Sequence, residues 1–371
     1  MKLAYIANVR MPTEKAHGVQ IMEMCAAFAS AGAELTLVVP WRFNKLKADP
    51  FQYYGVPRSF KIVKVPALDV LPVLRGRIGF LIEQFSFYVM AKLYVRSSKF
   101  DAIYGRDVVA PLFFKDSYFE VHNMPERQGK LFGWVINRAK HLFPVTGHLK
   151  DALITAGAPT GKITVVPDGV NLSMFQNRPE KEAARERLNL PVDRKIVVYT
   201  GSFYLYSWKG VDVLLETSGY FSADTLFVLV GGDEKEIADI KKKGVGPNVR
   251  LVPHRPHHEV AGYLAAADVL VLPNKTGSLH SERYTSPLKL FEYMASGVPI
   301  VASHLPSICE VLNENNAFLV TANSPERLAA GLRMVLLDAR GSRERADQAL
   351  KDVKKYSWDE RAVTIINKLD C

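Results

Sequence analysis

The order in which apolar segments follow one another constrains the fold of this chain more than any other feature. An apolar run at residues 2–9 is followed by a segment of helical spacing at residues 19–31, and a second apolar run follows at residues 34–39. Gly32 lies between the last two segments and is typical of a helix end. Because short strands that alternate with helices are characteristic of βαβ units, we expect an α/β fold with parallel sheets.

The same alternation continues through both halves of the chain. Each half should form a doubly wound sheet, and such sheets bind ligands at the carboxyl ends of their strands. Further strands are predicted at residues 61–65, 101–104, 118–122, 163–166, 195–200, 226–230, 249–252, 269–272, 299–302 and 317–320. Further helices are predicted at residues 211–219, 324–337, 342–355 and 357–369.

Residues 173–194 interrupt the alternation. This stretch is polar and charged and contains Pro179 and Pro191, so we interpret it as an interdomain hinge with a short helix. We therefore expect a first domain at residues 1–172 and a second domain at residues 195–356. The chain has 371 residues, of which 48% are apolar, so each domain can bury a core of its own.

Composition narrows the class of protein further. The chain contains no uninterrupted apolar run of about 18 residues or more, so we expect no membrane-spanning helix. Its first residues lack the long apolar core and the cleavage site of a signal peptide. The three cysteines have no metal-ligand spacing, and the histidines are scattered. These features predict a cytoplasmic protein without a structural metal.

The formal charge of +10 suggests an anionic partner, although it could serve solubility alone. Three kinds of partner would account for it: nucleic acid, an anionic membrane surface, or a phosphorylated small molecule. The sequence has no recognised nucleic-acid motif and no compact basic run. We therefore expect no nucleic-acid partner and keep the other two.

In the first half, residues 12–18 connect the first predicted strand to the first predicted helix. Free amides at a helix N-terminus suit an anion, although an ordinary connecting loop has the same pattern. No G-x-G-x-x-G motif follows the strand, which argues against a nicotinamide enzyme. Arg106 and His122 each lie at the carboxyl end of a predicted strand, where a functional role and a structural role are both open.

In the second half, residues 199–202 end a predicted strand and Lys209 precedes the next helix. A lysine in such a turn suits a diphosphate because its charge, the helix dipole and free amides act on the same anion. A solvated lysine is the alternative. Glu292 follows Phe291, which we expect to be buried, so the carboxylate should need a partner or a ligand hydroxyl. An exposed helix glutamate is the alternative there.

Together these segments resemble the retaining glycosyltransferases of family four, which have the GT-B fold. The resemblance covers nearly the whole chain and is most specific at residues 286–302. Residues 165–171 are similar to the family's interdomain element, and Tyr356-Ser357-Trp358 to the start of its last helix. The resemblance implies two Rossmann-like domains that face a central cleft. It also implies that the last helix, at about residues 357–371, packs back on the first domain.

The resemblance further implies roles for single residues. His17 and Arg106 would lie on the acceptor side, and the catalytic residues would be His122, Lys209 and Glu292. The implied donor-binding residues are Gly18, Gly201, Ser202, Lys209, Ser286, Pro287, Leu288, Lys289 and Glu292.

The sequence departs from the family pattern at the sugar-contacting acid. The family often shows two glutamates separated by seven residues, and Glu292 matches the second, which contacts the donor ribose. Tyr284 stands at the position of the first. Ser286, Lys289 or backbone amides are the candidates to contact the sugar in its place.

A second departure lies at Ser202, where the family often has an arginine, so we expect Lys209 to carry more of the phosphate charge. The implied function is retaining, metal-independent transfer of a hexose from a UDP-sugar or a GDP-sugar to a saccharide or a lipid-linked acceptor. Positioned cations would stabilise the leaving group, and no cofactor would be required. The pathway that the resemblance most readily implies for this protein is the assembly of surface polysaccharide or glycolipid.

Two other functions stay open from the sequence. One is a nucleotide-sugar epimerase of the same fold, and the other is a non-catalytic protein that binds a nucleotide-sugar or a glycan. Calorimetry and turnover assays separate them. The sequence does not identify the nucleotide base, the sugar, the acceptor or the oligomeric state.

Residues 70–100 mix basic and large apolar side chains, among them Leu74, Arg77, Phe80 and Phe85. We favour a core helix with a basic end. The alternative is a surface that lies against a membrane and meets a lipid-linked acceptor. In that case the protein would be peripheral at the inner face of the plasma membrane.

Overall fold

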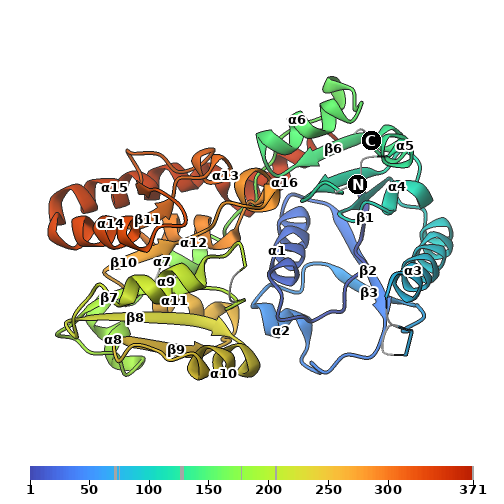
Figure 1. The fold of residues 1–371 in the computed structure, drawn as a ribbon. Coiled ribbons are helices and arrows are strands. Elements are labelled where there is room, and N and C mark those ends of the chain that lie inside the picture. Colours follow the sequence, from blue (N-terminus) through green and yellow to red (C-terminus); the bar gives the residue numbers. More distant parts are fainter. Residues whose placement is uncertain (71–72, 75, 126–128, 177, 205–206, 370–371) are drawn as a thin grey trace. The chain divides into compact units, whose positions relative to one another are not determined.

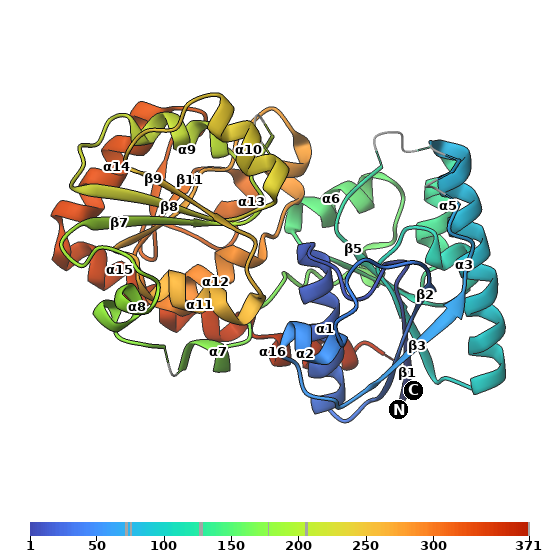
Figure 2. The same cartoon turned by 90° about the horizontal axis from the view of Figure 1, so that it is seen from below.

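A computed structural model describes residues 1–70, 73–74, 76–125, 129–176, 178–204 and 207–369 of the chain. The chain divides into two compact units, which are shown in Figures 1 and 2. The first unit comprises Met1–Asp168 together with Trp358–Cys371, and the second comprises Gly169–Ser357. Each unit is built on one six-stranded sheet, and all pairings between strands are parallel.

The sheet of the first unit has the strand order β3-β2-β1-β4-β5-β6. Its strands are β1 (Lys2–Ile6), β2 (Glu34–Trp41), β3 (Lys61–Pro66), β4 (Ala102–Gly105), β5 (Tyr118–Val121) and β6 (His141–Pro144). Its helices are α1 (Ala16–Ser30), α2 (Pro50–Tyr54), α3 (Arg77–Ser98), α4 (Ala110–Phe113), α5 (Lys130–Arg138), α6 (Gly147–Thr155) and α16 (Trp358–Ile366).

Helices cover both faces of this sheet. Helix α3 packs through Phe87 and Tyr88 on one face, against Ala4 and Ile6 of β1. Helices α1 and α16 pack on each other and are drawn on the opposite side of the sheet from α3. Because both faces are covered, the strands are apolar almost without interruption, as the sequence shows for residues 3–7.

The sheet of the second unit has the strand order β12-β11-β10-β7-β8-β9. Its strands are β7 (Lys195–Thr200), β8 (Thr225–Gly232), β9 (Val249–Pro253), β10 (Val269–Leu272), β11 (Ile300–Ser303) and β12 (Phe318–Val320). Its helices are α7 (Ser173–Gln176), α8 (Lys181–Arg187), α9 (Val211–Ser218), α10 (Glu234–Lys242), α11 (His257–Ala265), α12 (Leu288–Ser296), α13 (Pro306–Cys309), α14 (Pro325–Leu337) and α15 (Ala339–Asp352).

Two apolar clusters hold this second sheet between layers of helices. One face packs on α9, α10 and α14 through side chains such as Leu214, Ile240 and Leu332. The other face packs on α8, α11 and α12, where Phe291 is fully buried as expected.

Both sheets therefore have the doubly wound order in which the first and fourth strands of the unit are neighbours. In the first unit these strands are β1 and β4, and in the second they are β7 and β10. The strand order reverses at that point, which leaves a crevice at the carboxyl ends of the two strands where ligands bind in such folds. The α/β prediction with two doubly wound parallel sheets is confirmed.

Some local predictions were wrong. Residues 163–166 form only an isolated bridge between Leu142 and Ile163, and the sixth strand of the first sheet is β6, which we did not predict. The run of β6 is only four residues long, too short to give a recognisable period. Residues 173–194, which we expected to form an interdomain hinge with a short helix, contain α7 and α8 and group with the second unit. The hinge itself stays a prediction.

Helix α3 is less buried than a core helix. Ile78, Leu81 and Phe85 are 54–66% exposed, although Phe87 and Tyr88 on the inner face are fully buried. Among the described residues α3 is also the one helix that is long and apolar enough to cross a membrane, by length and composition only, and 33% of its most apolar window is buried. One such helix is weak evidence for a membrane span, because the core helix of a soluble protein passes the same test.

Candidate functional site

In the second unit, the ends of β7 and β8 form a closely packed floor. Gly201 and Gly231 both have positive φ angles, of 129° and 122°, which a residue with a side chain rarely adopts. A Cβ on Gly231 would lie 2.8 Å from the carbonyl oxygen of Gly201, and a Cβ on Gly201 would lie 3.0 Å from Nζ of Lys289. The glycines therefore let the lysine approach the backbone at the end of β7.

Lys289 lies in the first turn of α12, and its ammonium group is shielded from solvent. Nζ lies 3.8 Å from the centroid of the Tyr199 ring and has no hydrogen-bond partner among the described residues. Burial and the nearby charge of Lys209 hold the pKa of Lys289 well below its usual range. A buried ammonium without a hydrogen-bonded anion is costly, so this site favours binding of an anionic ligand.

Lys209 is the second cation of this cluster. Its Nζ donates a hydrogen bond to Oγ of Ser202 and lies 5.1 Å from the centroid of the Tyr204 ring. Burial lowers its pKa, and the charge of Glu236 partly opposes the shift. Ser202 stands where the resembled family often has an arginine. Its hydroxyl thus holds the Lys209 ammonium group beside that position.

Glu292, one turn after Lys289 on α12, already has a partner. Nε2 of His257 lies 2.6 Å from its Oε1, and the carboxylate is largely buried. The expectation that Glu292 needs a partner is confirmed, and the sequence did not identify His257 as that partner. Pro287 is the residue that precedes the first turn of α12, and Leu288 begins the helix.

The structure thus brings five of the predicted residues of the second unit together at one edge of its sheet, namely Gly201, Ser202, Lys209, Lys289 and Glu292. Ser286, Pro287 and Leu288 lie beside them at the N-terminus of α12. Tyr284, which replaces the first acid, ends a π-helical turn at His280–Tyr284. In the same turn, Oε1 of Glu282 accepts a hydrogen bond from the amide of Gly277 and so stabilises the preceding loop.

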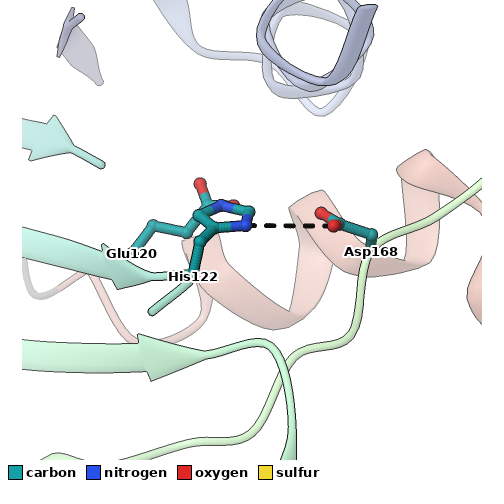
Figure 3. Close-up of side chains that lie close together, drawn as sticks. All are labelled: Glu120, His122 and Asp168. Carbon is teal, nitrogen blue, oxygen red and sulfur yellow. Dashed lines mark hydrogen bonds and ion pairs between the residues drawn. The ribbon is translucent and has the colours of Figure 1, made fainter. Parts of the chain in front are cut away.

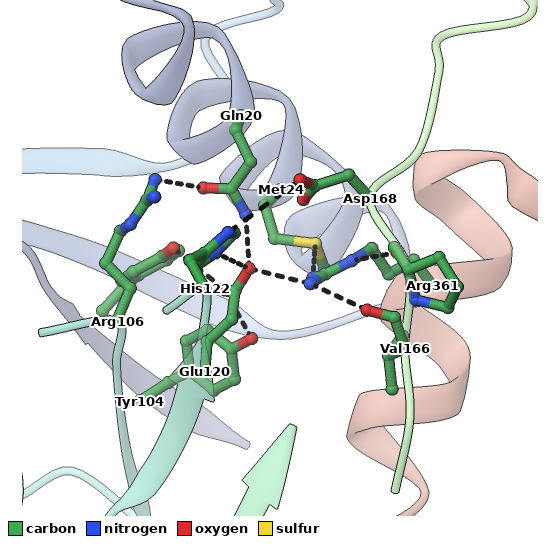
Figure 4. Close-up of polar contacts among 11 residues, drawn as sticks. Gln20, Met24, Tyr104, Arg106, Glu120, His122, Val166, Asp168 and Arg361 are labelled. Atoms are coloured by element: carbon green, nitrogen blue, oxygen red, sulfur yellow. Dashed lines mark hydrogen bonds and ion pairs between the residues drawn. The ribbon is translucent and has the colours of Figure 1, made fainter. Parts of the chain in front are cut away.

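In the first unit, the buried carboxylate of Glu120 on β5 is the centre of a network of polar side chains (Figure 4). Glu120 is fully buried and its Oε1 accepts hydrogen bonds from Gln20 and from Arg361 of α16, each at 2.7 Å. Its Oε2 accepts from Tyr104 at 2.7 Å. The charge of Arg361 holds the pKa of Glu120 well below its usual range, despite the opposing effect of burial.

His122 lies at the edge of this network (Figure 3). Its Nε2 is 2.6 Å from Oε1 of Glu120 and its Nδ1 is 3.9 Å from Oδ2 of Asp168. The side chain is 21% exposed, so the ring is held by carboxylates on both sides while one edge remains accessible. Burial raises the pKa of Asp168.

Among the described residues, one group has ligand atoms close enough together to share a metal ion. It consists of Glu120, His122 and Asp168. The geometry fits a cation poorly, because Oε1 of Glu120 already interacts with His122, Gln20 and Arg361. The fixed charge of Arg361 would also repel an added cation. We therefore assign the group to positioning of His122.

The remaining predicted residues of the first unit lie around the start of α1. A Cβ on Gly18 would collide with the hydroxyl of Tyr54, which both donates to the carbonyl and accepts from the amide of Thr13 at 2.7 Å. Nη1 of Arg106 donates to Oε1 of Gln20 at 2.8 Å. Burial, with the charges of Arg106 and Lys15, lowers the pKa of His17 to about 3.

Sequence reasoning missed Glu120, Gln20 and Arg361 in this network. Glu120 gave a signal, because it is a charged residue inside the apolar run of β5. Arg361 gave none, since it lies 241 residues away from the carboxylate that it binds.

The chain is similar to known proteins in sequence and in fold. The family model described as glycosyl transferases group 1 matches residues 194–338. The D-inositol 3-phosphate glycosyltransferase of Xylanimonas cellulosilytica is 28% identical over 261 residues, which cover 66% of this chain and 60% of that relative. The chain therefore matches less than two thirds of that relative's length.

Two solved structures share the fold over nearly the whole chain. The sucrose-phosphate synthase of Thermosynechococcus elongatus has a TM-score of 0.78 at 18% identity and covers 99% of this chain and 97% of its own. The Anabaena protein HepE was solved in complex with UDP and glucose. It has a TM-score of 0.78 at 15% identity, and the match covers 100% of this chain and 99% of HepE. The family model thus matches a segment within the second unit, and the solved structures show that the chain shares the GT-B fold.

Proposed function

We propose that this protein is a retaining glycosyltransferase that moves a hexose from a nucleotide-diphosphate sugar to a saccharide or lipid-linked acceptor. The observation that carries the proposal is the pair of lysines at the end of β7 in the second unit. Lys289 has a buried ammonium without a hydrogen-bond partner in the described structure, and Lys209 lies beside it. Two cations at the carboxyl ends of parallel strands match a diphosphate in charge and in place.

The chemistry follows from where charge develops. When the bond between the sugar and the diphosphate breaks, negative charge grows on the leaving phosphate. Lys209, Lys289 and the free amides at the N-terminus of α12 would stabilise that charge without reorganising. The two lysines supply the positive charge that a divalent ion supplies elsewhere, so we infer a metal-independent reaction.

Retention of configuration needs no carboxylate nucleophile in this scheme. The acceptor hydroxyl attacks the sugar from the same face on which the leaving group departs. The donor phosphate takes the proton of that hydroxyl. Glu292 is bound by His257 through one oxygen, which leaves its other oxygen for a ribose hydroxyl of the donor. In the first unit, His122 is our candidate catalytic residue, because Glu120 and Asp168 hold its ring in one orientation.

The relatives support the choice of donor and acceptor classes. HepE was solved with UDP-glucose as well as with UDP, which favours a uridine donor over a guanosine donor here. The name of the relative from Xylanimonas cellulosilytica states a sugar-like acceptor, D-inositol 3-phosphate. We place the reaction in assembly of a cell-surface polysaccharide or glycolipid in the cytoplasm.

The outer face of α3 supports peripheral attachment at the inner face of the plasma membrane. Ile78, Leu81 and Phe85 recur at helical spacing and are each more than half exposed. Lys92 and Arg96 are exposed toward the end of the same helix. An apolar face with adjacent cations fits an anionic membrane surface. Phe85→Glu with Leu81→Glu should abolish sedimentation with phosphatidylserine vesicles, and unchanged sedimentation would refute this attachment.

Release of UDP from UDP-glucose, with and without EDTA, tests the enzymatic proposal. We expect turnover that EDTA does not change, and a loss of about 100-fold or more in Lys209→Ala, as for removal of one positioned donor in other enzymes. Lys241→Ala is the matched control, because Lys241 is an exposed lysine of α10 in the same unit. Near-normal turnover in Lys209→Ala would refute the assignment, and binding without turnover would indicate a nucleotide-sugar-binding protein.

A further inference from the structure

Lys289 and Glu292 stand three residues apart on α12, a spacing that places two side chains on the same face of a helix. A lysine and a glutamate at this spacing attract each other. The two do not pair here, because Nζ of Lys289 has no hydrogen-bond partner among the described residues. Burial lowers the pKa of Lys289 and the charge of Glu292 opposes that fall, so the two groups are near enough to interact. A partner on another element can keep the carboxylate and the ammonium apart.

His257 is such a partner for the carboxylate. It is the first residue of α11, which packs against α12 in the same unit (Figure 2). Its Nε2 lies 2.6 Å from Oε1 of Glu292. An ionised carboxylate can only accept a hydrogen bond, so Nε2 of the ring donates. This bond holds Glu292 on α11, whereas the ammonium of Lys289 lies over the Tyr199 ring of β7.

Both members of the pair are shielded from water. The side chains of His257 and Glu292 are 16% and 10% exposed. A hydrogen bond to a charged group is stronger in such a place than at the surface, because water competes less for donor and acceptor. If Glu292 turned toward Lys289 it would lose this bond, so the carboxylate is held where it is.

The remaining surroundings of the Lys289 ammonium offer no second counter-ion. Among the described residues, the charges that act on it are those of Lys209 and Glu292, and Lys209 is itself a cation. The ring of Tyr199 and the backbone at Gly201 are uncharged neighbours. The position of Glu292 therefore decides whether the lysines stay open to an external anion or are neutralised within the chain.

We propose that His257 is a positioning residue of the donor site, which holds Glu292 on α11 and so prevents an internal ion pair with Lys289. The two lysines then remain available for the diphosphate. The inference rests on the proposed function, since it concerns the diphosphate site of Lys209 and Lys289. His257 acts through Glu292, and we assign it no contact with the donor.

Calorimetric titration of the full chain with UDP tests the inference through a double-mutant cycle. His257→Leu removes the hydrogen-bond donor, so Glu292 can pair with Lys289 and the affinity for UDP should fall by about tenfold or more. In the Glu292→Gln background no carboxylate is left to pair, so His257→Leu should change the affinity by less than about twofold. A purely structural role of His257 would cost the same in both backgrounds, and that result would overturn the inference.

A conservative variant separates loss of the hydrogen bond from damage to the fold. His257→Gln carries an amide nitrogen that can donate in place of Nε2, so it should bind UDP within about twofold of the wild type. His258→Leu is the matched control, because His258 is the next residue of α11 and is exposed. Thermal unfolding shows that each variant is folded. If His257→Gln binds UDP as weakly as His257→Leu, the inference is overturned.

Proton uptake on binding of UDP provides a second readout. When Glu292 pairs with Lys289, the ammonium is already charged before UDP binds. His257→Leu should therefore take up fewer protons than the wild type at about pH 8, measured in two buffers of different ionisation enthalpy. Equal uptake by the two proteins would overturn the inference. Failure of the wild-type chain to bind UDP would instead defeat the proposed function.

Discussion

Nη2 of Arg361 lies 2.7 Å from Oε1 of Glu120, and both side chains are at least 97% buried. The pair joins the last helix of the chain to β5 within the first unit, and Nε of Arg361 also donates to the carbonyl of Pro167 at 2.8 Å. The same carboxylate orients His122. The last helix is therefore part of the structure that positions the candidate catalytic histidine.

Arg361→Met should destabilise the first unit strongly. The substitution leaves the Glu120 carboxylate buried without its cation, and loss of one partner of a buried pair costs about 3–5 kcal/mol. Denaturant unfolding measures the change. Arg340→Met is the control, because Arg340 pairs with Glu344 on an exposed face of α15, so its substitution should cost far less stability. Equal effects of the two substitutions would contradict this role of Arg361.

His17 should make the stability depend on pH. Its pKa is about 3 in the folded chain against an unperturbed value of 6.5, so the unfolded chain binds more protons between these values. The free energy of unfolding should therefore rise with pH across that window, by at most about 1.4 kcal/mol per pH unit from this group. His17→Asn should reduce the slope of Tm against pH. The exposed His258→Asn should not, and an unchanged slope in His17→Asn would contradict the account.

Gly18→Ala should distort the loop before α1. The new Cβ would meet the Tyr54 hydroxyl, which is fixed by two hydrogen bonds to Thr13. Overpacking of this kind costs about 1–3 kcal/mol. Gly161→Ala is the control in the same unit, because no atom lies within 4 Å of its added Cβ. Tyr54→Phe should recover part of the loss in the double variant, and the absence of recovery would place the clash elsewhere.

The sequence predicted the parts of the fold that depend on local pattern and missed those that depend on distant partners. The buried strands of both sheets were predictable because they are apolar on both faces, and Lys209 because it follows a strand and precedes a helix. The strand β6 was missed because four residues carry no period. His257 and Arg361 were missed because their carboxylate partners are far away in sequence, and no local signal reports such a pair.

Lys289 should couple donor binding to proton uptake. The pKa of its buried ammonium is depressed without a ligand, and a bound diphosphate would favour the charged form and raise that pKa again. Between the two pKa values, binding takes up a proton, so affinity for UDP should fall as pH rises.

Calorimetry in two buffers of different ionisation enthalpy measures this uptake. The comparison belongs at about pH 8, well above the second phosphate pKa near 6. Lys289→Arg should bind UDP without uptake, because arginine stays charged, and Lys289→Met should bind weakly. The same uptake in Lys289→Arg as in the wild type would assign the proton to another group.

We expect the second unit to hold a nucleotide diphosphate between Lys209 and Lys289. Calorimetric titration of the purified chain with UDP, GDP, ADP and CMP, with and without a divalent ion, tests it most directly. One diphosphate, most readily UDP, should bind equally well with and without the ion. Lys209→Ala should lower the affinity by about tenfold or more. Binding of none of the four nucleotides to the folded chain would contradict the account.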